Sequence, residues 1–127
     1  MIDTEHVLHN NETLTNFLVM ARDNGLYPMV TVPSPERHIV SRILDAGAMG
    51  IILSHSKTIE DVDELVRWAK YPPVGSRALA LGANAGYTEG KASVYCEQAN
   101  NETMLFLKIE EYEGCLLYTS PNPRDRG

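Results

Sequence analysis

Short apolar runs alternate with stretches of helical periodicity along most of this chain. The runs cover residues 1–2, 28–32, 50–53 and 103–109. Nearly continuous apolar strands between amphipathic helices predict a parallel sheet that is covered by helices. Right-handed crossovers then leave two architectures, a barrel and an open doubly wound sheet. No GxGxxG motif follows any of these runs, which disfavours a dinucleotide-binding open sheet.

The expected helices carry recognisable start and stop signals. Residues that favour helix starts precede the first three of them, namely Asn10, the Ser34–Pro35 pair, and Thr58 with Asp61. Glycine or proline follows the last apolar position of each of these helices. Residues 75–90 then form a Gly- and Ala-rich loop, and residues 92–99 form a short further helix.

Composition excludes several classes of function. The chain has 127 residues and a formal net charge of −6, whereas nucleic-acid and anionic-membrane binding require a basic face. No apolar run reaches the roughly 18 residues that a membrane-spanning helix needs, and the start of the chain lacks the pattern of a signal peptide. The two cysteines form no CxxC pair. We therefore expect a single cytoplasmic domain without nucleic-acid or membrane partners.

Polar side chains follow the predicted strands. They are Asp3, Glu5 and His6 after the first strand, Thr31 in the second, Ser54 and His55 after the third, and Lys108 and Glu110 in or after the last. Active sites of parallel α/β folds lie at the carboxyl ends of the strands. These residues are therefore candidates for one site, provided that the fold brings them together.

Four segments resemble motifs of the HpcH/HpaI aldolase and citrate lyase family, in the family's order. Residues 2–6 (IDTEH) resemble its IDxEH signature, and residues 44–48 (LDAGA) resemble its LDAGA segment. Residues 71–77 (YPPVGSR) are similar to its YPPxGxRG loop, and Ala99–Asn100 with residues 107–110 are similar to its AN…QIE stretch. The resemblance implies a partial (β/α)8 TIM barrel of the phosphoenolpyruvate/pyruvate type. The first strand and the C-terminal half would be missing.

The resemblance also implies a chemistry. Family members resemble metal-dependent class II aldolases that reversibly cleave a 4-hydroxy-2-oxo acid to pyruvate and an aldehyde, using Mg²⁺ or Mn²⁺ to stabilise the enolate. Glu110 matches a metal carboxylate, His6 the catalytic base, and Asp45 a carboxylate that raises the basicity of that histidine. Full-length members are expected to form homo-oligomers.

Each of these assignments has a structural alternative. The alternative for Glu110 is a solvated residue after a strand, for His6 a histidine bonded to backbone, and for Asp45 local hydrogen bonding at a helix end. The family's second metal carboxylate lies on a later strand, outside this sequence. A lone carboxylate is a poor Mg²⁺ site, so we expect weak metal binding and no activity from this piece alone.

Two substitutions depart from the family pattern. Thr31 stands where the family has an arginine that clamps the pyruvate oxygen, and Lys108 stands where it has glutamine. Because Lys108 and Glu110 are two residues apart, they face the same side of a strand. We hypothesise that Lys108 supplies the cation that Thr31 does not. Arg77 either binds a carboxylate of the aldehyde partner or is a surface residue.

Two further functions remain open. One is a catalytically impaired, aldolase-like protein that binds a small oxo acid, since Thr31 has replaced the arginine. The other is a carbon–carbon lyase acting on a CoA thioester. A half barrel would also leave open strand edges, and we expect such a piece to associate or aggregate.

The last thirteen residues break the alternation. Residues 115–127 read CLLYTSPNPRDRG and resemble the translation of a sequencing adapter. We therefore expect a partial aldolase domain at residues 1–114 and a non-native tail at residues 115–127. A genuine disordered C-terminus is the alternative.

Overall fold

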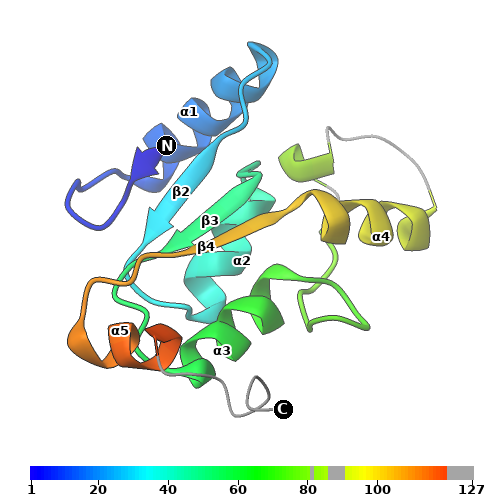
Figure 1. Ribbon diagram of the computed structural model, residues 1–127. Helices are drawn as coiled ribbons and strands as arrows, with labels where there is room; N and C mark the ends of the chain where they lie inside the picture. Colours follow the sequence, from blue (N-terminus) through cyan, green and yellow to red (C-terminus); the bar gives the residue numbers. More distant parts are fainter. Residues whose placement is uncertain (81, 86–90, 120–127) are drawn as a thin grey trace.

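The computed structural model describes residues 1–80, 82–85 and 91–119 (Figure 1). Strands and helices alternate along it, as the sequence predicts. In chain order the elements are β1 (Ile2–Asp3), α1 (Asn11–Asp23), β2 (Met29–Val32), α2 (Arg37–Asp45), β3 (Gly50–Leu53), α3 (Ile59–Ala69), η1 (Ala83–Ala85), α4 (Ala92–Glu102), β4 (Met104–Leu107) and α5 (Tyr112–Thr119).

The four strands form one parallel sheet in the order β1-β2-β3-β4. An open doubly wound sheet reverses its strand order at a switch point, whereas this order follows the chain throughout. It is the order of a barrel segment, as expected. The register pairs Asp3 with Thr31, Thr31 with Ile52, and Ile52 with Phe106, so these four residues form one row across the sheet.

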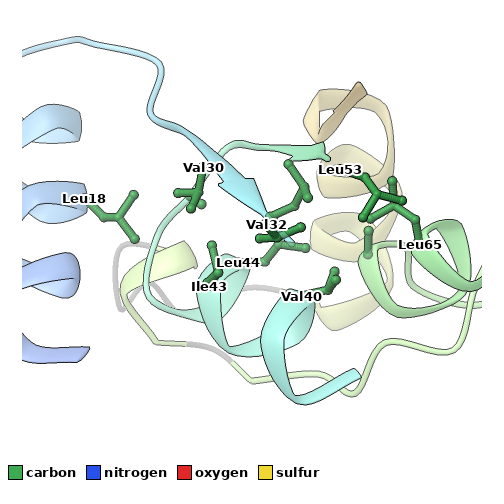
Figure 2. Close-up of a cluster of buried hydrophobic side chains, with 11 residues drawn as sticks. Leu18, Val30, Val32, Val40, Ile43, Leu44, Leu53 and Leu65 are labelled. Atoms are coloured by element: carbon green, nitrogen blue, oxygen red, sulfur yellow. The ribbon is translucent and has the colours of Figure 1, made fainter. Parts of the chain in front are cut away.

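The hydrophobic core lies between the sheet and the first three helices (Figure 2). Its strand residues alternate with the Thr31 row and therefore point to the opposite face. The sheet contributes Val30, Val32, Ile51 and Leu53 to this core, and the helices contribute Leu18, Val40, Ile43, Leu44 and Leu65. Burial of each such side chain contributes about 1.5–3 kcal/mol, so this layer holds the strands in place.

The other face of the sheet carries exposed apolar side chains. Met104 and Phe106 of β4 are each 45% exposed, and they point away from the core because they alternate with Leu105 and Leu107, which pack against it. In a closed barrel this face becomes the packed interior. The exposure of these two side chains therefore agrees with a partial barrel.

Helix boundaries follow the predicted signals with one exception. Asn10 caps α1 by accepting the backbone N–H of Thr13 at 2.7 Å, and Thr58 with Asp61 forms the predicted capping box of α3. The prediction for Ser34 was wrong, since α2 begins at Arg37 after Glu36. Ser34 does not cap the helix because its hydroxyl donates to the Glu36 carboxylate. Helix α4 (Ala92–Glu102) and strand β4 (Met104–Leu107) lie within three residues of expectation, whereas α5 (Tyr112–Thr119) was not expected from the sequence.

The turn after α3 packs directly on the end of that helix. The backbone N–H groups of Ser76 and Arg77 donate to the carbonyls of Arg67 and Lys70, at 2.6 and 3.0 Å. A Cβ atom at Gly75 would lie 2.3 Å from the Lys70 carbonyl oxygen. Only glycine therefore fits at position 75. The backbone hydrogen bonds of this turn fix the position of the Arg77 backbone against the end of α3.

Helix α5 runs across the expected boundary at residue 115. Gly114 is buried, and a Cβ there would lie 2.6 Å from the Ser56 carbonyl oxygen. Residue 115 is thus not a boundary of secondary structure. The prediction that residues 115–127 are non-native is a statement about their origin, and residues 120–127 lie outside the described part. Among the described helices, none has the length and apolar character to cross a bilayer.

Candidate active site at the carboxyl edge of the sheet

Residues that follow β1, β3 and β4 meet around Glu5, at what we call the carboxyl edge. Ser54 Oγ donates a hydrogen bond to Glu5 Oε2 at 2.5 Å, and His55 Nε2 lies 2.7 Å from Glu5 Oε1. Lys108 Nζ lies 3.4 Å from Glu5 Oε2. The Glu5 side chain is only 7% exposed. The strand-end residues therefore converge, as the sequence required for a shared site.

Asp3 shapes the loop that presents Glu5 and His6. Its Oδ1 accepts the backbone N–H groups of Glu5 at 2.9 Å and of His6 at 3.2 Å, which is how Asp commonly stabilises a tight turn. These two N–H groups lower the pKa of Asp3. The hydrogen bond from Ser54 lowers the pKa of Glu5, with a smaller contribution from Lys108, although partial burial opposes both. The edge thus holds its carboxylates ionised at neutral pH.

His55 bridges two carboxylates from different loops. Its Nδ1 lies 3.2 Å from Glu111 Oε1, while its Nε2 faces Glu5. Glu111 is itself paired with Lys57 at 2.8 Å. His55 has a φ of +52°, a left-handed conformation that costs a non-glycine residue about 1–2 kcal/mol. The contacts to Glu5 and Glu111 hold the ring in this position beside a cleft of about 430 Å³.

Lys108 lies between two carboxylates. Its Nζ is 3.3 Å from Glu110 Oε1 in addition to its contact with Glu5. Desolvation works against the charged form, but contacts with Glu110 and Glu5 outweigh it and raise the pKa of Lys108. The ammonium group therefore stays charged, and it neutralises part of the negative charge that Glu5 and Glu110 bring together.

His6 and Thr31 lie near this cluster in different ways. His6 Nε2 is 3.6 Å from Glu5 Oε2, and the His6 side chain is 74% exposed. His6 thus borders Glu5, and Glu110 borders Lys108, on the two sides of the Glu5–Lys108 pair. Thr31 shares the row of Asp3 and is buried, and its hydroxyl has no hydrogen-bond partner within the described residues.

Asp45 and Arg77 do not join this cluster. Asp45 ends α2, directly before β3, at the opposite end of the strands. Its Oδ1 accepts a hydrogen bond from Arg77 Nη2 at 2.7 Å. Within one chain Asp45 therefore lies away from the carboxyl edge, because α2 runs back along the sheet and carries its last residue to the amino end. The role of Asp45 beside His6 stays a prediction. Arg77 is 4% exposed, so its reading as a surface residue is wrong.

We call this opposite end the amino edge. The Arg77 guanidinium lies 4.7 Å from the centre of the Tyr71 ring. Asn100 binds the backbone of Tyr71 twice, accepting its N–H at 2.7 Å and donating to its carbonyl at 3.0 Å. Two of the motifs found in the sequence, YPPVGSR and AN, are thus joined by hydrogen bonds. Their role in this chain is to anchor the loop after α3.

Three residues of the carboxyl edge have no specific role predicted from the sequence. Glu5 and His55 are predicted only as strand-end candidates for a shared site, and no pattern singles out Glu111. Glu5 alternates with Asp3 after β1 in the way that Lys108 and Glu110 alternate after β4, which is a signal for a shared face. The bridge from His55 to Glu111 has no such signal, because it depends on the left-handed backbone at His55.

The donor set is suited to a divalent cation. One ligand atom each from Glu5, His55 and Glu110 lie within 4.8 Å of one another. Two ligands on opposite sides of an ion with bonds of about 2.1 Å lie about 4.2 Å apart, which is close to the separation of these donors. Glu110 therefore has two neighbouring donors, Glu5 and His55, within the described residues. The weak metal binding expected from the sequence stays a prediction.

Fold and site together define a class. A parallel sheet in barrel order, with charged residues at its carboxyl edge and an apolar open face, is a segment of a (β/α)8 barrel. No family model matches the chain. Comparisons with individual proteins are more specific.

Over 116 residues the chain is 30% identical to the hydroxypyruvate/pyruvate aldolase of Roseobacter denitrificans, covering 90% of this chain and 44% of that protein. The HpcH/HpaI aldolase structure from Desulfitobacterium hafniense matches with a TM-score of 0.83 at 27% identity, over 87% of this chain and 43% of the other. The citrate synthase SbnG matches with a TM-score of 0.78 at 35% identity, over 91% and 43%.

The chain belongs to the HpcH/HpaI aldolase/citrate lyase family. It spans less than half the length of the relatives it matches, and its four strands are part of a TIM barrel. The fold and family expected from the sequence are thereby confirmed.

Proposed function

We propose that the whole protein is a metal-dependent class II aldolase, which reversibly cleaves a 4-hydroxy-2-oxo acid to pyruvate and an aldehyde. The observation that carries this proposal is the convergence of Glu110, His6 and Lys108 around Glu5 at the carboxyl edge. Its support from comparison is that the relatives include an aldolase for hydroxypyruvate and pyruvate.

In this proposal Glu110 holds the cation, with Glu5 and His55 as neighbouring donors. A divalent cation there, Mg²⁺ or Mn²⁺, would supply Lewis-acid stabilisation of an enolate. His6 moves the proton of the substrate hydroxyl, since its side chain is exposed beside Glu5 and an imidazole can serve as a general base. Lys108 and the Thr31 hydroxyl face the oxo acid from the same side of the sheet.

Asp45 and Arg77 need a different account. Within one chain they lie at the amino edge, so Arg77 does not reach a substrate at the carboxyl edge of the same subunit. We keep both as predicted site residues only for an assembly in which the amino edge of one copy meets the carboxyl edge of another. A homo-oligomer is the assembly that the family resemblance predicts. Mutation of Arg77 with retention of the oligomer, and no change in kcat/KM, would remove it from the site.

The test is pyruvate release by the complete gene product from several 4-hydroxy-2-oxo acids, with and without added Mn²⁺. We expect metal-dependent activity that Glu110→Gln lowers by at least about a hundredfold. Glu102→Gln, a change at an exposed residue outside the carboxyl edge, serves as the matched control. Metal-independent activity, or equal activity of the Glu110→Gln and control proteins, would contradict the proposal.

A synthase that forms a carbon–carbon bond is the second candidate. Two observations favour it: the 35% identity to the citrate synthase SbnG, and the departure of Thr31 and Lys108 from the aldolase pattern. The two candidates differ in their substrates. Release of free thiol from a CoA thioester in the presence of an oxo acid, without pyruvate release in the aldol assay, would favour the synthase.

A further inference from the structure

The ammonium group of Lys108 occupies the space where a cation would bridge Glu5 and Glu110. Its Nζ lies 3.4 Å from Glu5 Oε2 and 3.3 Å from Glu110 Oε1. The backbone fixes this placement, since Lys108 N–H donates to the Leu53 carbonyl at 2.8 Å and continues the pairing of β4 with β3. Lys108 is thus held at the carboxyl edge by the sheet, and its flexible stem carries the charge between the two carboxylates.

The same two carboxylates are two of the three donors that converge there. Any divalent ion that binds Glu5 and Glu110 must displace the ammonium group, because two cations at contact distance repel each other. The third donor, His55, makes no contact with Lys108 in the described structure and offers a nitrogen instead of an oxygen. Lys108 therefore competes with a divalent ion for the two carboxylates and does not compete with it for the His55 imidazole.

We propose that Lys108 is a tethered competitor for the cation at this site and thereby weakens the binding of divalent ions there. The inference rests on the proposed function for the presence of a metal. Mg²⁺ depends on carboxylate charge, which Lys108 neutralises, and it gains little from imidazole. Mn²⁺ and Co²⁺ accept imidazole nitrogen as well as carboxylate oxygen. The site consequently binds divalent ions weakly, and it prefers Mn²⁺ or Co²⁺ over Mg²⁺ because of His55.

The test is calorimetric titration of the 127-residue chain with MnCl₂ and with MgCl₂, with far-UV circular dichroism to compare the folded fraction of each variant. Lys108→Met is expected to raise Mn²⁺ affinity about fivefold to tenfold, the effect of freeing two partly exposed ion pairs. Lys108→Arg keeps the charge and is expected to keep the weak binding. If Lys108→Met does not fold, Lys108→Gln provides the same loss of charge with a polar side chain.

Lys57→Met is the matched control. It removes the same charge from a lysine that pairs with Glu111, which is not among the three donors. We expect it to change Mn²⁺ affinity less than about twofold. His55→Ala is expected to lower affinity for Mn²⁺ and Co²⁺ while leaving Mg²⁺ affinity within about twofold, because only the former ions gain from the imidazole.

Equal Mn²⁺ affinity of wild type and Lys108→Met, or an equal gain in Lys57→Met, would overturn the role of Lys108. Absence of binding in every variant at millimolar metal would overturn it as well. These outcomes are separate from the fate of the proposed function. Lyase activity of the complete protein with no effect of Lys108 on metal affinity refutes only this inference, whereas the predicted affinities without any lyase activity refute only the function.

Discussion

The two edges of the sheet handle charge in opposite ways. At the carboxyl edge, more than one charged group contacts each of Glu5, Lys108 and His55, and most of these side chains are partly exposed. At the amino edge Arg77 is almost fully buried and, among the described residues, has one ionic partner, Asp45. Each of those three groups at the carboxyl edge has more than one ionic or hydrogen-bond partner. Loss of the Asp45 contact would leave the buried Arg77 charge without an ionic partner in the described structure.

This difference follows from the parallel sheet. All strands end at the same edge, so the loops there are free to carry chemistry, while the opposite edge holds the turns that return the chain. The comparison teaches that a motif shared with an enzyme family need not mark its reaction centre. The YPPVGSR and AN segments carry family resemblance, yet in this chain they fasten the end of α3 to α4 through Tyr71 and Asn100.

The largest expected effect is at the amino edge. Asp45→Ala leaves the buried Arg77 guanidinium without its carboxylate, and we expect the free energy of unfolding to fall by about 3 kcal/mol. Urea denaturation followed by circular dichroism measures it. Asp63→Ala, at an exposed position of α3, is the control and should stay within about 0.5 kcal/mol of wild type. Equal values for both variants would remove the contrast between the edges.

The next effect is on activity rather than stability. In a full-length protein carrying the same Thr31 and Lys108 pair, Lys108→Gln should lower kcat/KM for the aldol cleavage by about a hundredfold or more, because an oxo-acid anion would lose its cationic partner. The denaturation midpoint should stay nearly unchanged. Unchanged activity would show that Lys108 does not compensate for the missing arginine.

A smaller effect is expected where the carboxyl edge does contribute to stability. Thr58 caps α3 by accepting the backbone N–H of Asp61 at 3.2 Å, so Thr58→Ala should cost about 1 kcal/mol. Thr58→Ser retains the hydroxyl and should recover most of that loss in the same denaturation measurement. If Thr58→Ala does not change the free energy of unfolding, the cap does not stabilise the carboxyl edge, and its stability would have to come from the charged residues.

The smallest effect concerns acid. The folded chain lowers the pKa of Glu5 from its usual 4.5 and of Asp3 from its usual 3.8. The unfolded chain therefore takes up these protons first, so their contribution is complete above pH 4.5 and is lost as the pH falls further. Glu5→Gln should make unfolding less sensitive to pH below that value. A pH series of denaturation midpoints checks it, and an unaltered acid limb would speak against the Ser54 contact.

Much of the fold was predictable because it depends on local rules. Apolar runs at strand positions, caps at Asn10 and Thr58, and the uniform strand alternation all act over a few residues. The start of α2 was missed because Ser34 bonds to the Glu36 side chain instead of the helix backbone, a choice that residue type alone does not reveal.

The candidate site was predictable only in part. Glu110, Lys108 and His6 are at the carboxyl edge because strand ends meet there in any parallel sheet. The place of Asp45 at the amino edge was not predictable, because it depends on how far α2 runs back before β3 begins. Glu111 was missed because its partner His55 adopts a rare backbone conformation. Long-range geometry of this kind is set by packing, not by motif spacing.

The crowded turn at Gly75 makes a statement about natural variation. A Cβ atom at position 75 would lie within 3.0 Å of three carbonyl oxygens, those of Val66, Arg67 and Lys70. Related sequences that keep the same loop length should therefore retain glycine at this position. Val74 next to it is 59% exposed and should drift freely. If position 75 varied as readily as position 74 among related sequences, this loop would have to adopt another backbone conformation in those proteins.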